Sequence, residues 1–316
     1  PELVYHPDRL LYPLKRTRPK GDPDPGWQRI SWEEALNLTA ERLRSLADQY
    51  GPQSVVFSAA SPSTTAIADS AVWIERLMRA YGSPNLCVSM ELCGWGRYLA
   101  TRYTYGSGVP GLYMPDLEHA SCILFWGYNP NVARLAHATA TNKALKRGAR
   151  LIVVDPRRAG LAAKADLWLQ VKPGTDGALA LAIAQVMIDR GWYDRKFVQE
   201  WTNGPLLVRS DNGHFLTERD LDEAGSPQVY LAWNEVDHCP VIYEPAGGRY
   251  AGDTGQLACF GEFTIDTPAG SVTCRPAFDL AAEVCRSIPL EGVESVCGVR
   301  AGQIVEAARL LWEARP

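Results

Sequence analysis

The feature that most constrains the fold is an alternation of apolar and helix-forming segments between residues 120 and 190. "ASCILFWG" (120–127), "ARLIVVDPR" (149–157) and "DLWLQV" (166–171) are short apolar runs bounded by Gly, Pro or Asp, a pattern typical of buried strands. Helices are expected from "NVARLAHATATNKALKRG" (131–148) and "GTDGALALAIAQVMIDRG" (174–191). Strands and helices in this order predict a parallel sheet in an α/β domain.

The preceding part of the chain also has a mixed α/β pattern. "SWEEALNLTAERLRSLADQYG" (31–51) predicts a helix, with Ser31 and Glu34 spaced as a capping box. "SVVFS" (54–58) predicts a buried strand. Residues 1–30 are rich in Pro and basic side chains, and we expect them to form an extended lead-in without a packed element.

Beyond about residue 204 the pattern changes to short strands with Gly/Pro turns. "VYLAWNEVDHCPVIYEPAGGRYAG" and "FTIDTPAGSVTCRP" predict antiparallel strands in an inserted arm near residues 205–278. We therefore divide the chain into an α/β segment (1–117) and a Rossmann-like domain (118–316) that carries the antiparallel β insertion. The predicted fold class is α/β.

Composition narrows the classes of function. The chain is 46% hydrophobic and 22% charged with a net charge of −4, so it has the composition of a globular protein and no basic footprint for nucleic acid. No apolar run is long enough to predict a membrane span. The eight cysteines form no C-x-x-C pair, which argues against a zinc ribbon or a local iron–sulfur motif, and most are expected to be reduced core thiols.

Polar residues and glycines follow each of the three predicted parallel strands. In an open parallel sheet, ligands bind at the carboxyl ends of the strands. The candidate binding residues are Gly127 and Asn129 after the first strand, Asp155 and Arg157 after the second, and Gly174 and Asp176 after the third.

These residue types suit a nucleotide. Asp155 or Asp176 can accept two N–H bonds from a guanine edge, Arg157 can pair with a phosphate, and Gly127 and Gly174 allow close backbone approach. The chain has neither a G-x-G-x-x-G fingerprint nor a P-loop. Taken alone, Asp176 is an ordinary helix N-terminal acid, so the prediction depends on the ordered set of three strand ends.

Cys93 is a further candidate, in "ELCGWGR" directly after "GSPNLCVSM". It follows a strand–helix unit at the start of another helix, where α/β proteins often place functional groups. The local sequence alone leaves two readings open, a small buried residue and a metal ligand.

Several ordered motifs together resemble one family. They are "HPDRLLYPLKR", "ISWEEAL", "WGYNP", "LIVVDPR", "KPGTDGALALA", "WYDRKFVQEWTNG" and "GVRAGQIVEAARLL". The set resembles the molybdopterin oxidoreductase family of the dimethyl sulfoxide reductase type. The resemblance covers nearly the whole chain and is weakest between about 205 and 275. It implies a bis(molybdopterin guanine dinucleotide) cofactor with molybdenum or tungsten.

The resemblance assigns expected roles to the candidate residues. Cys93 corresponds to the metal ligand and implies a catalytic thiolate on the metal; Ser89, Glu91 and Cys87 are the rival positions. Arg97 lies nearby and is expected either to face an anionic substrate or to form a surface ion pair. The expected contacts to the pterin–guanine cofactor are Gly127, Asn129, Asp155, Arg157, Gly174 and Asp176.

Members of this family usually also have an N-terminal [4Fe–4S] region and a C-terminal domain. The chain is therefore expected to be an internal fragment of a larger oxidoreductase and inactive alone. Expected partners are a small-molecule substrate and an iron–sulfur electron-transfer subunit. The alternatives are a non-catalytic scaffold or electron-transfer subunit, and a hydratase of the acetylene hydratase type. Location stays open between the cytoplasm and export by a twin-arginine signal.

Overall fold

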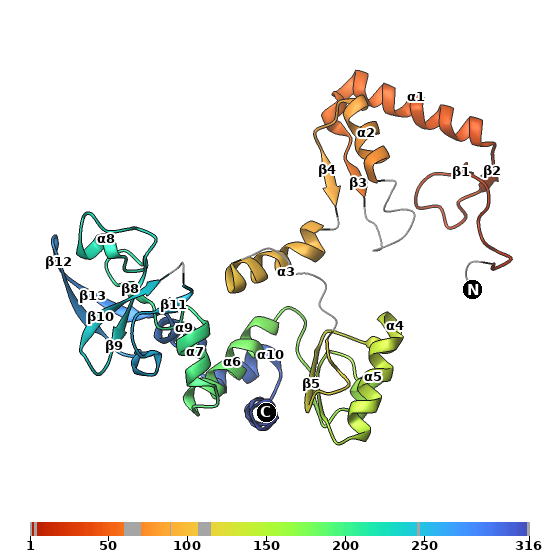
Figure 1. The fold of residues 1–316 in the computed structure, drawn as a ribbon. Coiled ribbons are helices and arrows are strands. Elements are labelled where there is room, and N and C mark those ends of the chain that lie inside the picture. The colour runs from red at the N-terminus through yellow and green to blue at the C-terminus, as the bar shows by residue number, and fades with distance from the viewer. Residues whose placement is uncertain are drawn as a thin grey trace. The chain divides into compact units, whose positions relative to one another are not determined.

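The computed structural model describes residues 2, 5–59, 71–88, 90–106, 115–244 and 247–314. The chain divides into two compact units, Pro1–Met114 and Pro115–Pro316. Both units contain parallel strands together with helices, which confirms the α/β prediction (Figure 1). The elements of the first unit are β1 (Leu14–Arg16), β2 (Trp27–Arg29), α1 (Trp32–Tyr50), the 3₁₀ turn η1 (Pro52–Ser54), β3 (Phe57–Ala59), α2 (Ala71–Tyr81), β4 (Leu86–Val88) and α3 (Met90–Tyr105).

The lead-in contains a hairpin, so the prediction of an extended segment without a packed element was wrong. β1 and β2 pair antiparallel, with Leu14 opposite Arg29. Side chains close the connection: Thr17 Oγ1 donates to the Gly26 carbonyl at 2.6 Å, and Asp24 Oδ1 accepts from the Gly26 N–H at 2.9 Å. These side-chain bonds hold the turn in a Pro-rich segment whose pattern reads as irregular.

α1 begins as the sequence predicts. Ser31 Oγ accepts from the Glu34 N–H at 3.0 Å, as an N-cap does. The Glu34 carboxylate lies 3.7 Å from Lys15 Nζ on the hairpin. The helix ends at Gly51, whose φ of 81° suits glycine.

A two-stranded parallel sheet and α2 complete the described core of the first unit. β3 pairs with β4, and α2 packs against β3. The Tyr81 hydroxyl at the end of α2 donates to the Leu43 carbonyl of α1 at 2.9 Å, and its ring lies edge-on to Phe57. These contacts fix α2 on α1, and β4 then leads towards α3.

The second unit is built on a three-stranded parallel sheet in the order β5-β6-β7. Trp126 at the end of β5 pairs with Val154 of β6, and Val154 pairs with Leu169 of β7. The elements around the sheet are β5 (Cys122–Trp126), α4 (Pro130–Ala133), α5 (Leu135–Lys146), β6 (Arg150–Val154), the 3₁₀ turn η3 (Gly160–Lys164), β7 (Leu167–Leu169), α6 (Asp176–Asp189), α10 (Leu290–Cys297) and α11 (Ala301–Glu313).

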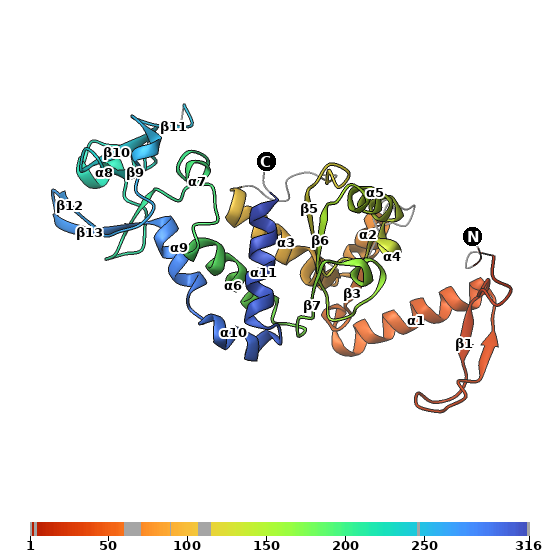
Figure 2. The same cartoon turned by 90° about the horizontal axis from the view of Figure 1, so that it is seen from below.

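The sheet is covered on both faces. β6 is buried from Leu151 to Val154, as expected for a central parallel strand rich in β-branched residues. One core cluster joins the sheet to α6, α10 and α11, and the other joins it to α5 and η3. Figure 2 shows β5, β6 and β7 side by side, with α5 on one side and α6 and α11 on the other. Loops at the strand ends therefore extend from a rigid support.

The inserted arm is antiparallel, as the sequence predicts. Its sheets have the orders β11-β10-β9 and β12-β13-β8. The remaining elements are α7 (Arg195–Trp201), β8 (Leu207–Arg209), α8 (Glu218–Leu221), β9 (Leu231–Asn234), β10 (Cys239–Glu244), β11 (Arg249–Tyr250), the 3₁₀ turn η4 (Thr254–Gln256), β12 (Phe263–Thr267), β13 (Gly270–Pro276) and α9 (Ala277–Cys285).

One predicted helix is broken. The segment 131–148 forms α4 and α5, separated at Arg134, whose φ of −153° and ψ of 88° are not helical. Among the helices in the described part of the chain, none is long and apolar enough to cross a bilayer.

Candidate functional site

The three parallel strands end at the same edge of the sheet, and the six cofactor-binding candidates lie in the loops and helix start that follow them. Parallel strands in the order β5-β6-β7 place their carboxyl ends side by side. The candidates are Gly127, Asn129, Asp155, Arg157, Gly174 and Asp176.

The loop after β5 is fixed by its backbone. Gly127 has a φ of 59°, and its N–H donates to the Val154 carbonyl at 2.8 Å. Asn129 Oδ1 accepts from the Asn131 N–H at 3.2 Å and caps α4. The Tyr128 hydroxyl and His137 Nδ1 share a hydrogen bond of 2.8 Å, which ties the loop to α5.

The loop after β6 is held by Asp155. Its Oδ1 accepts from the Arg157 N–H at 2.7 Å, and its carbonyl accepts from Trp168 Nε1 at 2.9 Å. Gln170 Nε2 donates to the Pro156 carbonyl at 3.2 Å from the next strand end. Arg157 is exposed, so its guanidinium remains accessible to an anion.

The segment after β7 turns at Gly174 into α6. Gly174 has a φ of 85° and open space where a Cβ would stand. Thr175 Oγ1 donates back to the Lys172 carbonyl at 2.6 Å instead of capping the helix. Asp176, the first residue of α6, accepts a 2.7 Å hydrogen bond on Oδ1 from Trp126 Nε1. The end of β5 and the start of α6 are thus joined directly.

Three residues of this edge were missed by the sequence analysis: Trp126, Gly160 and Gln170. Trp126 ends β5, and the alternation of side chains along that strand places it on the face that α6 covers. A Cβ on Gly160 would lie 2.6 Å from Asn129 Oδ1, so the loops after β5 and β6 touch there. Of these signals, only the strand-end position of Trp126 is visible in the sequence.

The perturbed carboxyl of this sheet lies at its opposite end. Asp166 precedes β7, and its Oδ2 accepts from the Leu151 N–H at 2.8 Å while Oδ1 contacts Arg150 Nη1 at 2.7 Å. Burial opposes ionisation, but these bonds outweigh it and hold the pKa of Asp166 below its usual range. This pair supports the sheet at the end away from the cofactor candidates.

The second group of candidates lies in the first unit. Cys93 and Arg97 belong to α3, which follows β4, and Cys93 is in its first turn. Their side chains, those of Glu91 and the whole of Ser89 lie outside the described residues; Cys87, in β4, is exposed. Within the part of the chain that the structure describes, no cluster of three or more His, Cys, Asp or Glu residues is arranged to hold a metal. The role of Cys93 stays a prediction.

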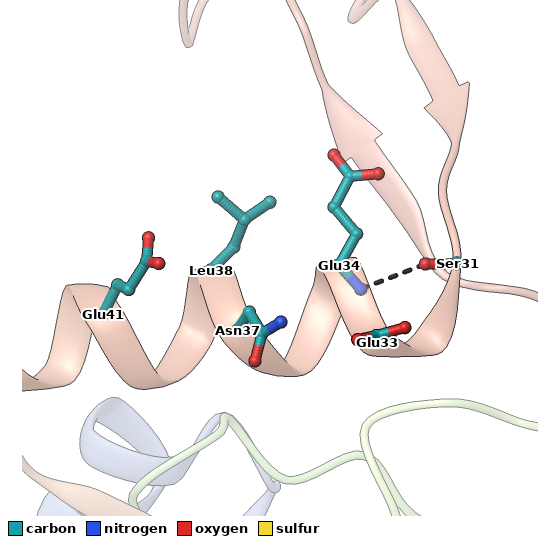
Figure 3. Close-up of a pocket in the computed structure, with 6 residues that line it drawn as sticks. All are labelled: Ser31, Glu33, Glu34, Asn37, Leu38 and Glu41. Carbon is teal, nitrogen blue, oxygen red and sulfur yellow. Dashed lines mark hydrogen bonds between the residues drawn. The ribbon is translucent and has the colours of Figure 1, made fainter.

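A shallow hollow along α1 lies apart from all these candidates. It is lined by Ser31, Glu33, Glu34, Asn37, Leu38 and Glu41, and Figure 3 shows the Ser31–Glu34 capping bond at one end. Its carboxylates project from one exposed helix face, where solvated acids are ordinary, so it carries no functional assignment.

Taken together, these features define an α/β protein with a ligand crevice of the nucleotide-binding type at the carboxyl ends of a parallel sheet. Residues 9–286 match the family model described as molybdopterin oxidoreductase. The chain belongs to this family.

Individual relatives agree. The chain is 30% identical over 342 residues to a protein of Halobacterium salinarum described as a putative dimethyl sulfoxide reductase catalytic chain, covering 100% of the chain and 37% of that protein. It is 32% identical over 256 residues to a dopamine dehydroxylase of Eggerthella lenta, covering 74% of the chain and 24% of that protein. It is 37% identical over 202 residues to an acetylene hydratase of Syntrophotalea acetylenica, covering 63% of the chain and 26% of that protein.

The fold agrees as well. The solved structure of acetylene hydratase from Pelobacter acetylenicus has a TM-score of 0.55 to the chain at 27% identity, covering 100% of the chain and 32% of that structure. The chain therefore spans about a third or less of that enzyme, and a pterin-dependent family is confirmed for a chain that corresponds to part of its relatives.

Proposed function

We propose that this chain contributes to a bis(molybdopterin guanine dinucleotide) centre of a molybdenum- or tungsten-dependent oxidoreductase. In this proposal the second unit holds one pterin–guanine dinucleotide and the first unit supplies a ligand to the metal. The observation that carries the proposal is the edge formed by the loops after β5, β6 and β7 in a chain of this family.

The residues present at this edge fit such a group. Gly127 and Gly174 have open space where a Cβ would stand, which leaves room for a ligand against the backbone. Asp155 uses one oxygen to accept from the Arg157 N–H, and so shapes its own loop. We therefore assign the guanine edge to Asp176 and a phosphate to the exposed Arg157. Asn129 would support the same cofactor through the loop after β5.

The first unit would hold the metal. Cys93 lies in the first turn of α3, where the positive end of the helix favours an anionic ligand such as a thiolate. Soft thiolates suit molybdenum and tungsten. Arg97 follows one turn later along α3 and is proposed to neutralise an anionic substrate. When bound, the metal–pterin group supplies two-electron redox or oxo-transfer chemistry.

A second candidate activity is hydration. It is favoured by the similarity to acetylene hydratase, in both sequence and fold. Such an enzyme would use the same Cys93 ligand and the same strand-end cofactor residues, but without net electron transfer. The third alternative is a scaffold or electron-transfer subunit that has kept the fold without metal. A [4Fe–4S] cluster elsewhere in the whole protein and an iron–sulfur partner subunit belong to the redox proposal alone.

Metal and pterin content test the proposal. The whole protein that contains this chain would be expressed with molybdate and with tungstate, as wild type, Cys93→Ala and Cys87→Ala. We expect about one metal and two pterin guanine dinucleotides per wild-type protein. Metal should be lost, or its spectrum changed, in Cys93→Ala alone, because Cys87 is the matched nearby thiol on β4.

The alternatives give different results. A wild-type protein without metal or pterin under both supplements would sink the enzyme proposal and favour the scaffold. A metal-loaded protein that hydrates an alkyne, with no turnover of an electron donor, would favour the hydratase. Equal effects of Cys87→Ala and Cys93→Ala would reject Cys93 as the specific ligand.

A further inference from the structure

Trp126 is anchored independently of Asp176. It is the last residue of β5 and is half-buried, and its side chain packs against the core cluster formed by β6, β7, α6, α10 and α11. A ring held by core packing keeps one orientation. Its Nε1–H therefore points from a fixed position at Asp176 Oδ1, 2.7 Å away.

Asp176, by contrast, has little else to fix it. The residue is exposed, and among the described residues its side chain accepts a hydrogen bond only from Trp126. Its Oδ2 and a second lone pair on Oδ1 remain available. One indole N–H thus limits the rotation of a carboxylate that still has two acceptor positions facing away from the indole.

We infer that Trp126 is a positioning residue for base selectivity: it orients the Asp176 carboxylate towards a base that presents two adjacent N–H donors. This inference rests on the proposed function, in which Asp176 meets the guanine edge. Guanine presents N1–H and the 2-amino group side by side. Adenine presents an acceptor at N1, which a carboxylate repels, and hypoxanthine lacks the 2-amino group.

The chemistry explains why orientation matters. A bidentate pair needs both carboxylate oxygens in the plane of the base at the same time. A freely rotating carboxylate still attracts a base, but it discriminates less between one donor and two. Loss of the Trp126 N–H should therefore lower selectivity more than it lowers binding of the phosphates.

The test uses the full chain and GDP, IDP and ADP as probes, with affinities measured by calorimetry. Trp126→Phe removes the N–H and keeps an aromatic ring. Trp192→Phe is the matched control, because Trp192 packs against the same core cluster beyond the other end of α6. We expect Trp126→Phe to reduce the preference for GDP over ADP by about tenfold, the value of one charge-assisted hydrogen bond. Trp192→Phe should leave it unchanged.

A double variant tests whether Trp126 acts through Asp176. In an Asp176→Ala background, Trp126→Phe should change the GDP/ADP ratio no further. An additional loss of selectivity in that background would overturn the inference, as would an unchanged ratio in Trp126→Phe alone. In both cases GDP binding by the wild type would leave the proposed function standing. No detectable GDP binding by the folded wild type would overturn the cofactor site itself and the inference with it.

A second readout keeps the test valid if Trp126→Phe does not fold. The indole N–H resonance of Trp126 in the wild type can be assigned from its change in Asp176→Ala. GDP should shift this resonance more than ADP or inorganic phosphate does. Equal shifts with all three probes would overturn the inference.

Discussion

Gly160 lies against Asn129: a Cβ at position 160 would stand 2.6 Å from Asn129 Oδ1. Gly160 follows β6 and Asn129 follows β5, so this contact holds two strand-end loops together. Gly160 also has a φ of 56°, in the left-handed region that favours glycine. Two requirements therefore restrict this position to glycine, the backbone conformation and the space beside Asn129.

Gly160→Ala should weaken both stability and nucleotide binding. The left-handed conformation costs an alanine about 1–2 kcal/mol, and a displaced Asn129 would lose a cap worth about 1 kcal/mol. Gly148→Ala is the control, because Gly148 has a φ of 95° but open space around it. Urea unfolding should show a loss in both variants, larger in Gly160→Ala. GDP calorimetry should show weaker binding in Gly160→Ala only. Equal losses of stability with unchanged GDP affinity in both would mean that the Asn129 contact has no role.

The parallel sheet could be predicted from the sequence because its signals are local. β6 is an uninterrupted run of apolar β-strand formers, and the residues that end the three strands appear in order along the chain. The Trp126–Asp176 bond could not be predicted in this way, because its partners are separated by 50 residues and meet only once α6 packs on the sheet. The β1–β2 hairpin was missed because its turn is held by the side chain of Asp24, not by a recognisable turn motif.

The site divides in the same manner. The order of strand-end residues predicted where Asp155 and Arg157 would lie, but it could not distinguish a loop-forming aspartate from a ligand-facing one. That distinction comes from the bond between Asp155 Oδ1 and the Arg157 N–H. The roles of Cys93 and Arg97 depend on side chains outside the described residues and stay predictions.

Arg157→Ala should weaken GDP binding by about tenfold, because it removes one charge-assisted contact to a phosphate. The same variant should bind with a smaller dependence on salt concentration, since screening acts on the lost ion pair. Arg158→Ala is the matched control: the Arg158 guanidinium lies 5.7 Å from the centre of the Trp168 ring and is engaged there. Calorimetry at two salt concentrations measures both effects. If the two variants lost affinity equally, general positive charge would explain the binding and Arg157 would have no specific contact.

Asp166→Asn should reduce stability at neutral pH and have less effect in acid. The folded pKa of Asp166 is lowered, so its contribution is present above the unfolded value of about 3.9 and is lost as pH falls through the folded pKa. Weakening the bonds to Arg150 and the Leu151 N–H should cost about 1–2 kcal/mol at pH 7. Urea unfolding at pH 7 and at pH 3 measures the difference. Asp116→Asn removes an exposed partner of His119 and should leave the pH 7 unfolding midpoint unchanged. A constant cost of Asp166→Asn at both pH values would contradict an ionic contribution.

Two cysteines should differ sharply in reactivity. Cys274 on β13 is fully buried, and burial raises its pKa to about 11, so almost no thiolate exists at pH 8. Cys87 on β4 is exposed. Iodoacetamide at pH 8, followed by peptide mass mapping, should modify Cys87 within minutes and Cys274 only after urea unfolding. Because alkylation requires both thiolate and access, the protection of Cys274 should end at the urea concentration at which the β12–β13–β8 sheet unfolds. Modification of Cys274 in the folded chain at the rate of Cys87 would mean that this sheet opens readily, and the inserted arm would then be a separately unfolding part of the second unit.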